Sequence, residues 1–115
     1  MKLKAIGVGG KVIEWIKDWL SERKQRVVIE DNYSDWADVV SSVIQGSVLG
    51  GTFFNVFIDD IDDSVLGALL RKFADDTKLA MVIGSIEDAQ RMQDNLDRIC
   101  EWADRWRMSF NVKKC

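Results

Sequence analysis

The chain has 115 residues, of which 47% are apolar and 30% charged, and its net charge is −3. The length predicts one domain over residues 1–115, and the composition is ordinary for a soluble globular protein. No apolar run approaches the ~20 residues that span a bilayer, and the first residues lack the apolar core of a signal peptide. An intracellular chain without a membrane segment is therefore expected.

The residue types that are missing narrow the chemistry further. The sequence has no histidine and only two cysteines, Cys100 and Cys115. Serine–histidine and cysteine–histidine nucleophile pairs and the usual zinc sites are excluded, and no disulfide framework is expected. If the chain belongs to an enzyme, carboxylates acting with magnesium are the chemistry that remains.

The first third of the chain predicts a helix followed by two extended segments. In residues 11–20, apolar side chains recur at spacings of three and four, which is typical of an amphipathic helix. This stripe comprises Val12, Trp15, Ile16, Trp19 and Leu20. The two tryptophans are expected in the core. Residues 24–30 favour a strand and residues 36–43 a second extended run, with a polar turn between them.

The middle of the chain begins with a glycine-bearing break at residues 44–51. Ser47 is suited to cap a helix that starts there. The apolar segment that follows, up to about Ile61, favours a buried helix, although its Phe and Val content leaves a strand open. Four aspartates then lie close together, at positions 59, 60, 62 and 63. Because the calcium-loop spacing is absent, a solvated acidic turn is favoured over a metal loop.

Residues 69–83 predict a β-hairpin. An apolar run ends at Phe73, two aspartates follow, and the residues after them alternate between apolar and polar. This pattern places the tip of the hairpin near Asp75 and Asp76. Two carboxylates that close repel each other unless a cation or a proton lies between them. Aspartate is also simply a good turn residue, and that reading stays open at this point.

The last third predicts a long helix and a final strand. Ser85 is suited to cap a helix that runs to about Trp106, with Glu87 and Asp88 in its first turn. Residues 107–112 resume alternation and would form a strand. The full order is helix, two strands, helix, hairpin, helix, strand. It predicts an α+β fold in which helices pack on one face of an antiparallel sheet.

With these motifs in place, the chain resembles the palm region of reverse transcriptases from non-LTR (LINE-type) retrotransposons, a class of transposable element. Residues 9–21 resemble the helix ahead of motif B, and Gln-Gly-Ser-Val-Leu-Gly at 45–50 resembles motif B. Phe-Ala-Asp-Asp at 73–76 resembles motif C, and residues 102–115 resemble the motif D region. The match runs essentially end to end and implies a palm-like (ferredoxin-like) fold.

The resemblance implies an RNA-directed DNA polymerase, which is a nucleotidyltransferase. In such enzymes magnesium assists the attack of a primer 3′-hydroxyl on the α-phosphorus of a dNTP, with RNA as template and DNA as primer. Asp75 and Asp76 would be the catalytic residues and the metal ligands. Gln45 and Gly46 would lie under the incoming nucleotide and the template. Lys114 would lie near the pyrophosphate.

The sequence also departs from the family pattern. Family members use a further aspartate from motif A, together with fingers and thumb, and this chain contains none of these. Ile44 and Gly51 stand where the family usually has proline, and Ser42 where it usually has glycine. The isolated chain is therefore expected to be inactive and to bind magnesium weakly or not at all. A non-enzymatic remnant that binds a partner, or pairs with a second copy through an exposed sheet edge, stays open as the alternative.

Overall fold

The structure, a computed structural model, describes residues 2–114, so Cys115 of the motif D match lies outside the described residues. Helices and antiparallel strand pairs alternate along this part of the chain, which confirms the predicted α+β class. The α-helices are α1 (Lys2–Ala5), α2 (Gly10–Leu20), α3 (Val48–Ile58) and α4 (Ile86–Arg105). The strands are β1 (Lys24–Gln25), β2 (Val28–Ile29), β3 (Asn32–Tyr33), β4 (Ala37–Asp38), β5 (Leu69–Phe73) and β6 (Asp76–Ala80). Two 3-10 helices, η1 (Asp59–Ser64) and η2 (Val112–Lys114), complete the described elements.

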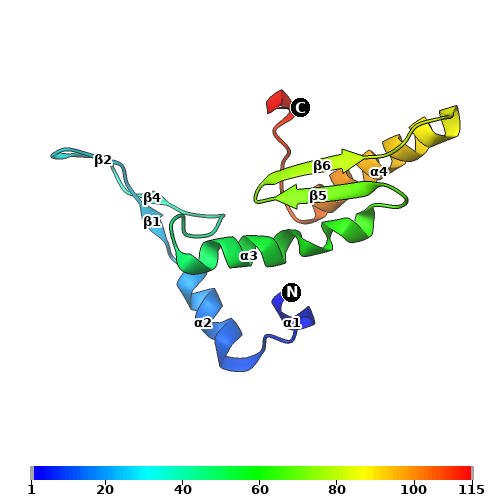
Figure 1. The fold of residues 1–115 in the computed structure, drawn as a ribbon. Helices are drawn as coiled ribbons and strands as arrows, with labels where there is room; N and C mark the ends of the chain where they lie inside the picture. Colours follow the sequence, from blue (N-terminus) through cyan, green and yellow to red (C-terminus); the bar gives the residue numbers. More distant parts are fainter. Residues whose placement is uncertain (1, 115) are drawn as a thin grey trace. The chain divides into compact units, whose positions relative to one another are not determined.

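The strands pair only in twos. β1 pairs with β4, β2 with β3 and β5 with β6, each antiparallel (Figure 1). The expected antiparallel pairing is thus present, but among the described residues it is divided over three two-stranded sheets.

By its internal packing the chain forms two compact units, one ending at Phe57 and the other beginning at Ile58. Among residues 2–114, every helix is too short or too polar to cross a bilayer.

In the N-terminal unit, the predicted amphipathic helix is confirmed as α2. Its buried residues are Ile13 and Ile16. Trp19 stacks on Trp15, with 6.0 Å between ring centroids, and meets the ring of Phe53 edge-on at 5.7 Å. Trp15 is 52% exposed, so the expectation that both tryptophans lie in the core is wrong for this one. The buried face of α2 keeps Ile16, Trp19 and Leu20 of the predicted stripe but has Ile13 in place of Val12 and Trp15.

In the C-terminal unit, the core lies between η1 and α4. Its buried apolar side chains are Ile58, Ile61, Ile99, Trp102 and Ala103. Asn95 of α4 is 1% exposed. Its side chain accepts a hydrogen bond from the Leu66 backbone N–H at 2.8 Å and donates one to the Leu66 carbonyl at 3.0 Å. The loop that leads into β5 is therefore fixed to the buried face of α4.

Helix α4 has the predicted bounds, but the strand predicted after it is wrong. Ser85 accepts a hydrogen bond from the Asp88 N–H at 3.1 Å, as an N-cap does. At the other end, Arg107 adopts a left-handed φ of +57°. Its N–H donates to Asp104 and the Met108 N–H to Ala103, which is the Schellman arrangement. The alternating residues 107–112 therefore close the helix, and their first backbone donors are not available to a sheet.

Candidate active-site hairpin

The aspartate pair lies at the end of the β5–β6 hairpin, as the sequence predicts. Phe73 is the partner of Asp76 in the ladder, so Ala74 and Asp75 form a two-residue turn. Such tight turns require a left-handed residue, and Ala74 supplies it with φ = +50°. This conformation costs a non-glycine residue on the order of 1 kcal/mol. Asp75 and Asp76 are both exposed at this tip.

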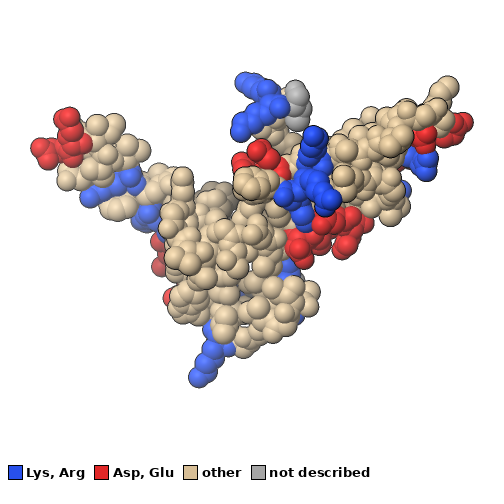
Figure 2. All heavy atoms as spheres, in the orientation of Figure 1, with Lys and Arg blue, Asp and Glu red and all other residues tan. Residues whose placement is uncertain are grey.

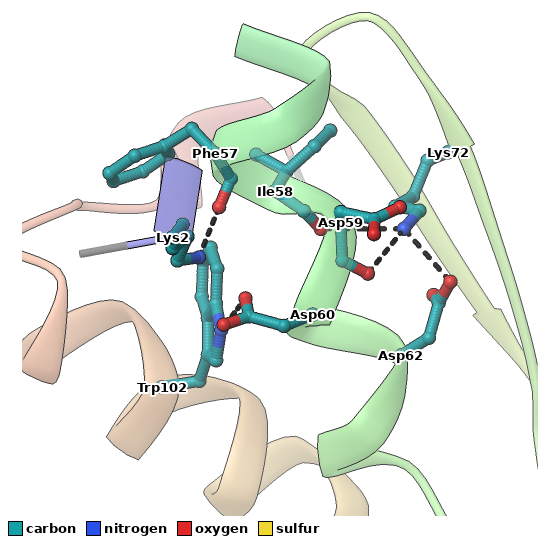
Figure 3. A network of polar contacts seen from close by, with 8 residues as sticks. All are labelled: Lys2, Phe57, Ile58, Asp59, Asp60, Asp62, Lys72 and Trp102. Atoms are coloured by element: carbon teal, nitrogen blue, oxygen red, sulfur yellow. Dashed lines mark hydrogen bonds and ion pairs between the residues drawn. The ribbon is translucent and has the colours of Figure 1, made fainter. Parts of the chain in front are cut away.

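The hairpin is anchored by Lys72, which sequence reasoning did not single out. Its ammonium donates hydrogen bonds to the Asp62 carboxylate at 2.8 Å, to the Asp59 carbonyl at 3.1 Å and to the Ile58 carbonyl at 3.3 Å (Figure 3). The Lys72 side chain is only 20% exposed. Lysine satisfies carbonyls at the end of α3, where a cation is favourable. The signal in the sequence was a lysine two residues after Leu70, on the face of the strand that Leu70 helps to bury.

The acidic segment after α3 is a 3-10 helix in which Asp60 and Asp62 have side-chain partners. Asp62 pairs with Lys72, and the Asp60 carboxylate accepts a hydrogen bond from the Trp102 indole N–H at 2.8 Å (Figure 3). Asp59 and Asp63 are exposed. Among residues 2–114, no group of three or more acidic, cysteine or histidine side chains is arranged to hold a metal ion. The segment predicted as a solvated acidic turn is thus a 3-10 helix in which Asp60 and Asp62 bind other side chains.

The donor set at the hairpin tip suits magnesium in type but is incomplete in number. Asp75 and Asp76 offer carboxylate oxygens, the ligands that this hard cation prefers. Within the described residues, no third acid joins them. Magnesium is commonly held by one or two carboxylates together with waters and substrate phosphates. The pair therefore fits part of a magnesium site that other groups would complete.

Gln45 and Gly46 belong to the N-terminal unit and form the turn that precedes α3. The Ser47 N–H donates to the Ile44 carbonyl at 3.2 Å, and Gly46 has φ = +79°. A positive φ at the third residue is typical of a type II turn, which favours glycine there. Ser47 then caps α3 as predicted, because its hydroxyl oxygen accepts a hydrogen bond from the Gly50 N–H at 3.0 Å.

Gly50 is held closely against this turn. A Cβ at Gly50 would lie 2.9 Å from the Ser47 hydroxyl and 3.0 Å from the Ile44 carbonyl. No heavy atom lies within 4 Å of a Cβ built on Gly46. Glycine is thus required at Gly50 by space and at Gly46 by backbone conformation. The Gln45–Gly46 turn is therefore fixed to the first turn of α3.

At Ser42, one of the departures from the family pattern, the backbone keeps a conformation that glycine favours. It stands where the family usually has glycine, and its φ is +74°, a left-handed conformation that favours glycine. The Arg23 guanidinium donates a hydrogen bond to the Ser42 carbonyl at 2.7 Å. The backbone geometry thus remains the one that glycine suits, although the residue has changed.

Lys114 lies at the end of η2, with its side chain exposed. Its N–H donates to the Asn111 carbonyl at 3.0 Å. Asp75 and Asp76 are adjacent in the C-terminal unit, which also contains Lys114, whereas Gln45 and Gly46 lie in the N-terminal unit.

Comparison with known proteins agrees with the resemblance seen in the motifs. The family model described as reverse transcriptase (RNA-dependent DNA polymerase) matches residues 1–115. The chain is 32% identical over 110 residues to the RNA-directed DNA polymerase from mobile element jockey of Drosophila melanogaster, covering 87% of this chain. It is 31% identical over 115 residues to the jockey polymerase of Drosophila funebris, covering 91% of this chain. No solved structure matches.

A third relative is the probable RNA-directed DNA polymerase from transposon X-element of Drosophila melanogaster, 33% identical over 104 residues and 86% of this chain. The match spans 12% of the length of each of these three relatives. The predicted relationship to transposable-element reverse transcriptases is therefore confirmed. From the motif order, the hairpin geometry and the full-length family match together, the chain belongs to the reverse transcriptase (RNA-dependent DNA polymerase) family.

Proposed function

We propose that this chain supplies the catalytic hairpin and the nucleotide-facing turn of a polymerase that copies RNA into DNA. The observation that carries the proposal is the pair of exposed carboxylates, Asp75 and Asp76, at the tip of a tight hairpin in a member of this family. Asp75 and Asp76 would hold magnesium. When bound, magnesium activates the primer hydroxyl and neutralises the leaving pyrophosphate.

The remaining predicted residues orient the substrates in this proposal. Gln45 and Gly46 would face the dNTP and the RNA template, because an open glycine turn lets a ligand approach the backbone closely. Lys114 would place its exposed ammonium near the pyrophosphate. Asp76, paired with Phe73 in the ladder, has a fixed backbone, so its carboxylate is presented from a rigid strand.

The 115-residue chain by itself is inactive in this proposal. Among the described residues, the two tip carboxylates are the only acids gathered at the hairpin end, and two-metal transfer in this family uses a further aspartate. Two protein ligands are few for magnesium, so we expect binding in the millimolar range.

A metal-binding experiment tests the role of the tip. Trace manganese, added as a paramagnetic substitute for magnesium, should broaden the backbone NMR signals of residues 74–77. Asp75→Asn with Asp76→Asn should abolish this broadening. The matched control is Glu30→Gln with Asp31→Asn, because these two acids form the two-residue turn of the β2–β3 hairpin. Equal broadening at both turns, or broadening that survives the Asp75 and Asp76 changes, would contradict the proposed site.

A primer-extension assay tests the chemistry. The chain alone should extend no DNA primer on an RNA template. A polypeptide that joins this chain to a strand carrying a further aspartate should extend the primer, and Asp75→Asn should remove that activity. Templated synthesis by the chain alone would refute the inactivity. A joined polypeptide that extends no primer, or one whose extension survives Asp75→Asn, would refute the polymerase function.

Self-association is a second candidate function, favoured by the unpaired strand edges. Each described sheet has only two strands, and Val28, Ile29 and Tyr33 of the β2–β3 hairpin are more than half exposed. Exposed apolar edges favour strand pairing between copies. Sedimentation at high micromolar concentration should then show a dimer that Ile29→Lys dissociates. A strict monomer would refute this function.

A further inference from the structure

One face of the β5–β6 hairpin carries two cations directly opposite each other. Side chains of a strand alternate between its two faces. Arg71 is the ladder partner of Lys78, and both side chains are exposed. Figure 2 shows Lys and Arg side chains gathered over β5 and β6. The half-buried Lys72, by contrast, belongs to the opposite face and is bound to Asp62.

This arrangement is unfavourable for the hairpin alone. Like charges placed directly opposite in an antiparallel pair destabilise it. Among the described residues, neither Arg71 nor Lys78 has an ion-pair or side-chain hydrogen-bond partner. An anion placed between the two side chains would convert this repulsion into attraction on both sides. A phosphate suits this role, because arginine and lysine are its usual protein donors.

We propose that Arg71 and Lys78 bind a backbone phosphate of the nucleic-acid strand on which the hairpin acts. This inference rests on the proposed polymerase function and adds a second contact to it. The contact is independent of base sequence, because it involves only the phosphate. It therefore positions the strand and does not select it.

The spacing along β6 gives the position of this contact. Lys78 lies two residues beyond Asp76, which corresponds to about 7 Å of strand. Asp76 and Lys78 are also on the same face of β6, because side chains two residues apart in a strand point the same way. The bound phosphate is then close to the part of the strand on which the tip carboxylates act. A strand held there would present its end to Asp75 and Asp76.

The salt dependence of binding tests this contact. The probe is a DNA primer annealed to an RNA template, titrated with the 115-residue chain at several sodium chloride concentrations and followed by fluorescence anisotropy. Each phosphate contact adds about 0.7–0.9 to the slope of log affinity against log salt concentration. Arg71→Gln with Lys78→Gln should therefore lower the slope by about 0.7–0.9, the contribution of the one phosphate that the two side chains share.

The matched control is Lys11→Gln with Arg98→Gln. Both of these residues are exposed helix positions, and either double variant removes two positive charges, from −3 to −5. The control should keep the wild-type slope. An unchanged slope in the Arg71 and Lys78 variant, or an equal loss in the control, would overturn the inference and leave the proposed function standing. No binding by the wild-type chain would overturn both.

Thermal unfolding separates a phosphate contact from a structural role. Removal of the two like charges relieves their repulsion, so the Arg71 and Lys78 variant should unfold at the wild-type temperature or above it. A lower unfolding temperature, together with weaker binding, would show that the pair supports the hairpin and would overturn the phosphate site.

Discussion

Two hairpins in this chain have closely similar turns and very different supports. β2–β3 turns on Glu30 and Asp31, and β5–β6 turns on Ala74 and Asp75. In each, the first turn residue is not glycine and has a positive φ, +54° at Glu30 and +50° at Ala74. Both tips also carry acidic residues, Glu30 and Asp31 in β2–β3 and Asp75 and Asp76 in β5–β6. The β2–β3 ladder has two residue pairs, whereas the β5–β6 ladder has five.

The hairpin with the longer ladder, β5–β6, is also the one whose strands are packed and hydrogen-bonded to the rest of the protein. Val28, Ile29 and Tyr33 of β2–β3 are each more than half exposed. Leu70, Lys72 and Leu79 of β5–β6 are half-buried, and Lys72 is bound to the end of α3 and to η1. A pair of acids at a turn is therefore not enough to define a site. Ligands that act on a substrate need a backbone that is held in one geometry.

Loss of Asn95 should remove this support most strongly. Asn95→Leu removes two hydrogen bonds that the buried Asn95 side chain makes to the Leu66 N–H and carbonyl, and each lost bond costs about 1–2 kcal/mol. We expect a loss of about 2–4 kcal/mol in the free energy of unfolding, measured by urea denaturation. Hydrogen exchange should accelerate in β5–β6 and stay unchanged in β2–β3. Gln93→Leu, an exposed change on the same helix, should cost less than about 1 kcal/mol; an equal loss would contradict the role of Asn95.

Lys72→Met should loosen the hairpin by a smaller amount. The change keeps an apolar chain of similar length and removes three hydrogen bonds from a side chain that is mostly buried. We expect about 2 kcal/mol of destabilisation, confined to β5, β6 and η1. Hydrogen exchange residue by residue measures it. Lys24→Met serves as the control, because Lys24 meets Asp38 at 4.0 Å in an exposed pair and should contribute less than about 0.5 kcal/mol.

Ala74→Gly should stabilise the chain by about 1 kcal/mol, because glycine adopts a positive φ without steric cost. Glu30→Gly should have an effect of the same size, since its φ is nearly equal. Urea denaturation of both variants tests whether the two turns differ only in their supports. If one variant stabilises the chain and the other destabilises it, the turns are not equivalent.

The smallest expected effect is a pH dependence at the loop that follows β6. The Gly84 N–H, Arg91 and Ser85 lower the pKa of Asp88 from 3.8 to about 2. A group whose pKa is lowered by folding stabilises the fold above its unfolded pKa and loses this contribution as the pH falls. The difference in stability between wild type and Asp88→Asn should therefore be constant above about pH 5 and shrink as the pH falls towards 2. A difference that is the same at pH 2 and pH 5 would contradict this linkage.

The sequence predicted what depends on local pattern. The bounds of α2 and α4, the cap at Ser47 and the hairpin tip all follow from periodicity and turn chemistry within a few residues. The roles of Asn95 and Lys72 could not be predicted this way. Each bonds to a backbone group or an acid that is ten or more residues away. Such partners follow from tertiary packing, which a single sequence does not reveal.

The wrong strand at residues 107–112 has a different cause. Its alternation is present in the sequence, but the first N–H groups of this segment donate to the end of α4. A Schellman ending at a non-glycine residue gives little signal in sequence, because Arg107 occupies the position that glycine usually fills. Trp15 was misplaced because the buried line of α2 passes through Ile13 and Ile16.

Among residues 2–114, five residues share an uncommon backbone state. Glu22, Glu30, Ser42, Ala74 and Arg107 all have a positive φ without being glycine, and all five are exposed. A β-branched side chain is strongly disfavoured in that state. In a saturation-mutagenesis screen, valine, isoleucine and threonine should therefore be depleted at these five surface positions. A tolerance map of this protein would have intolerant sites that solvent accessibility alone would score as permissive.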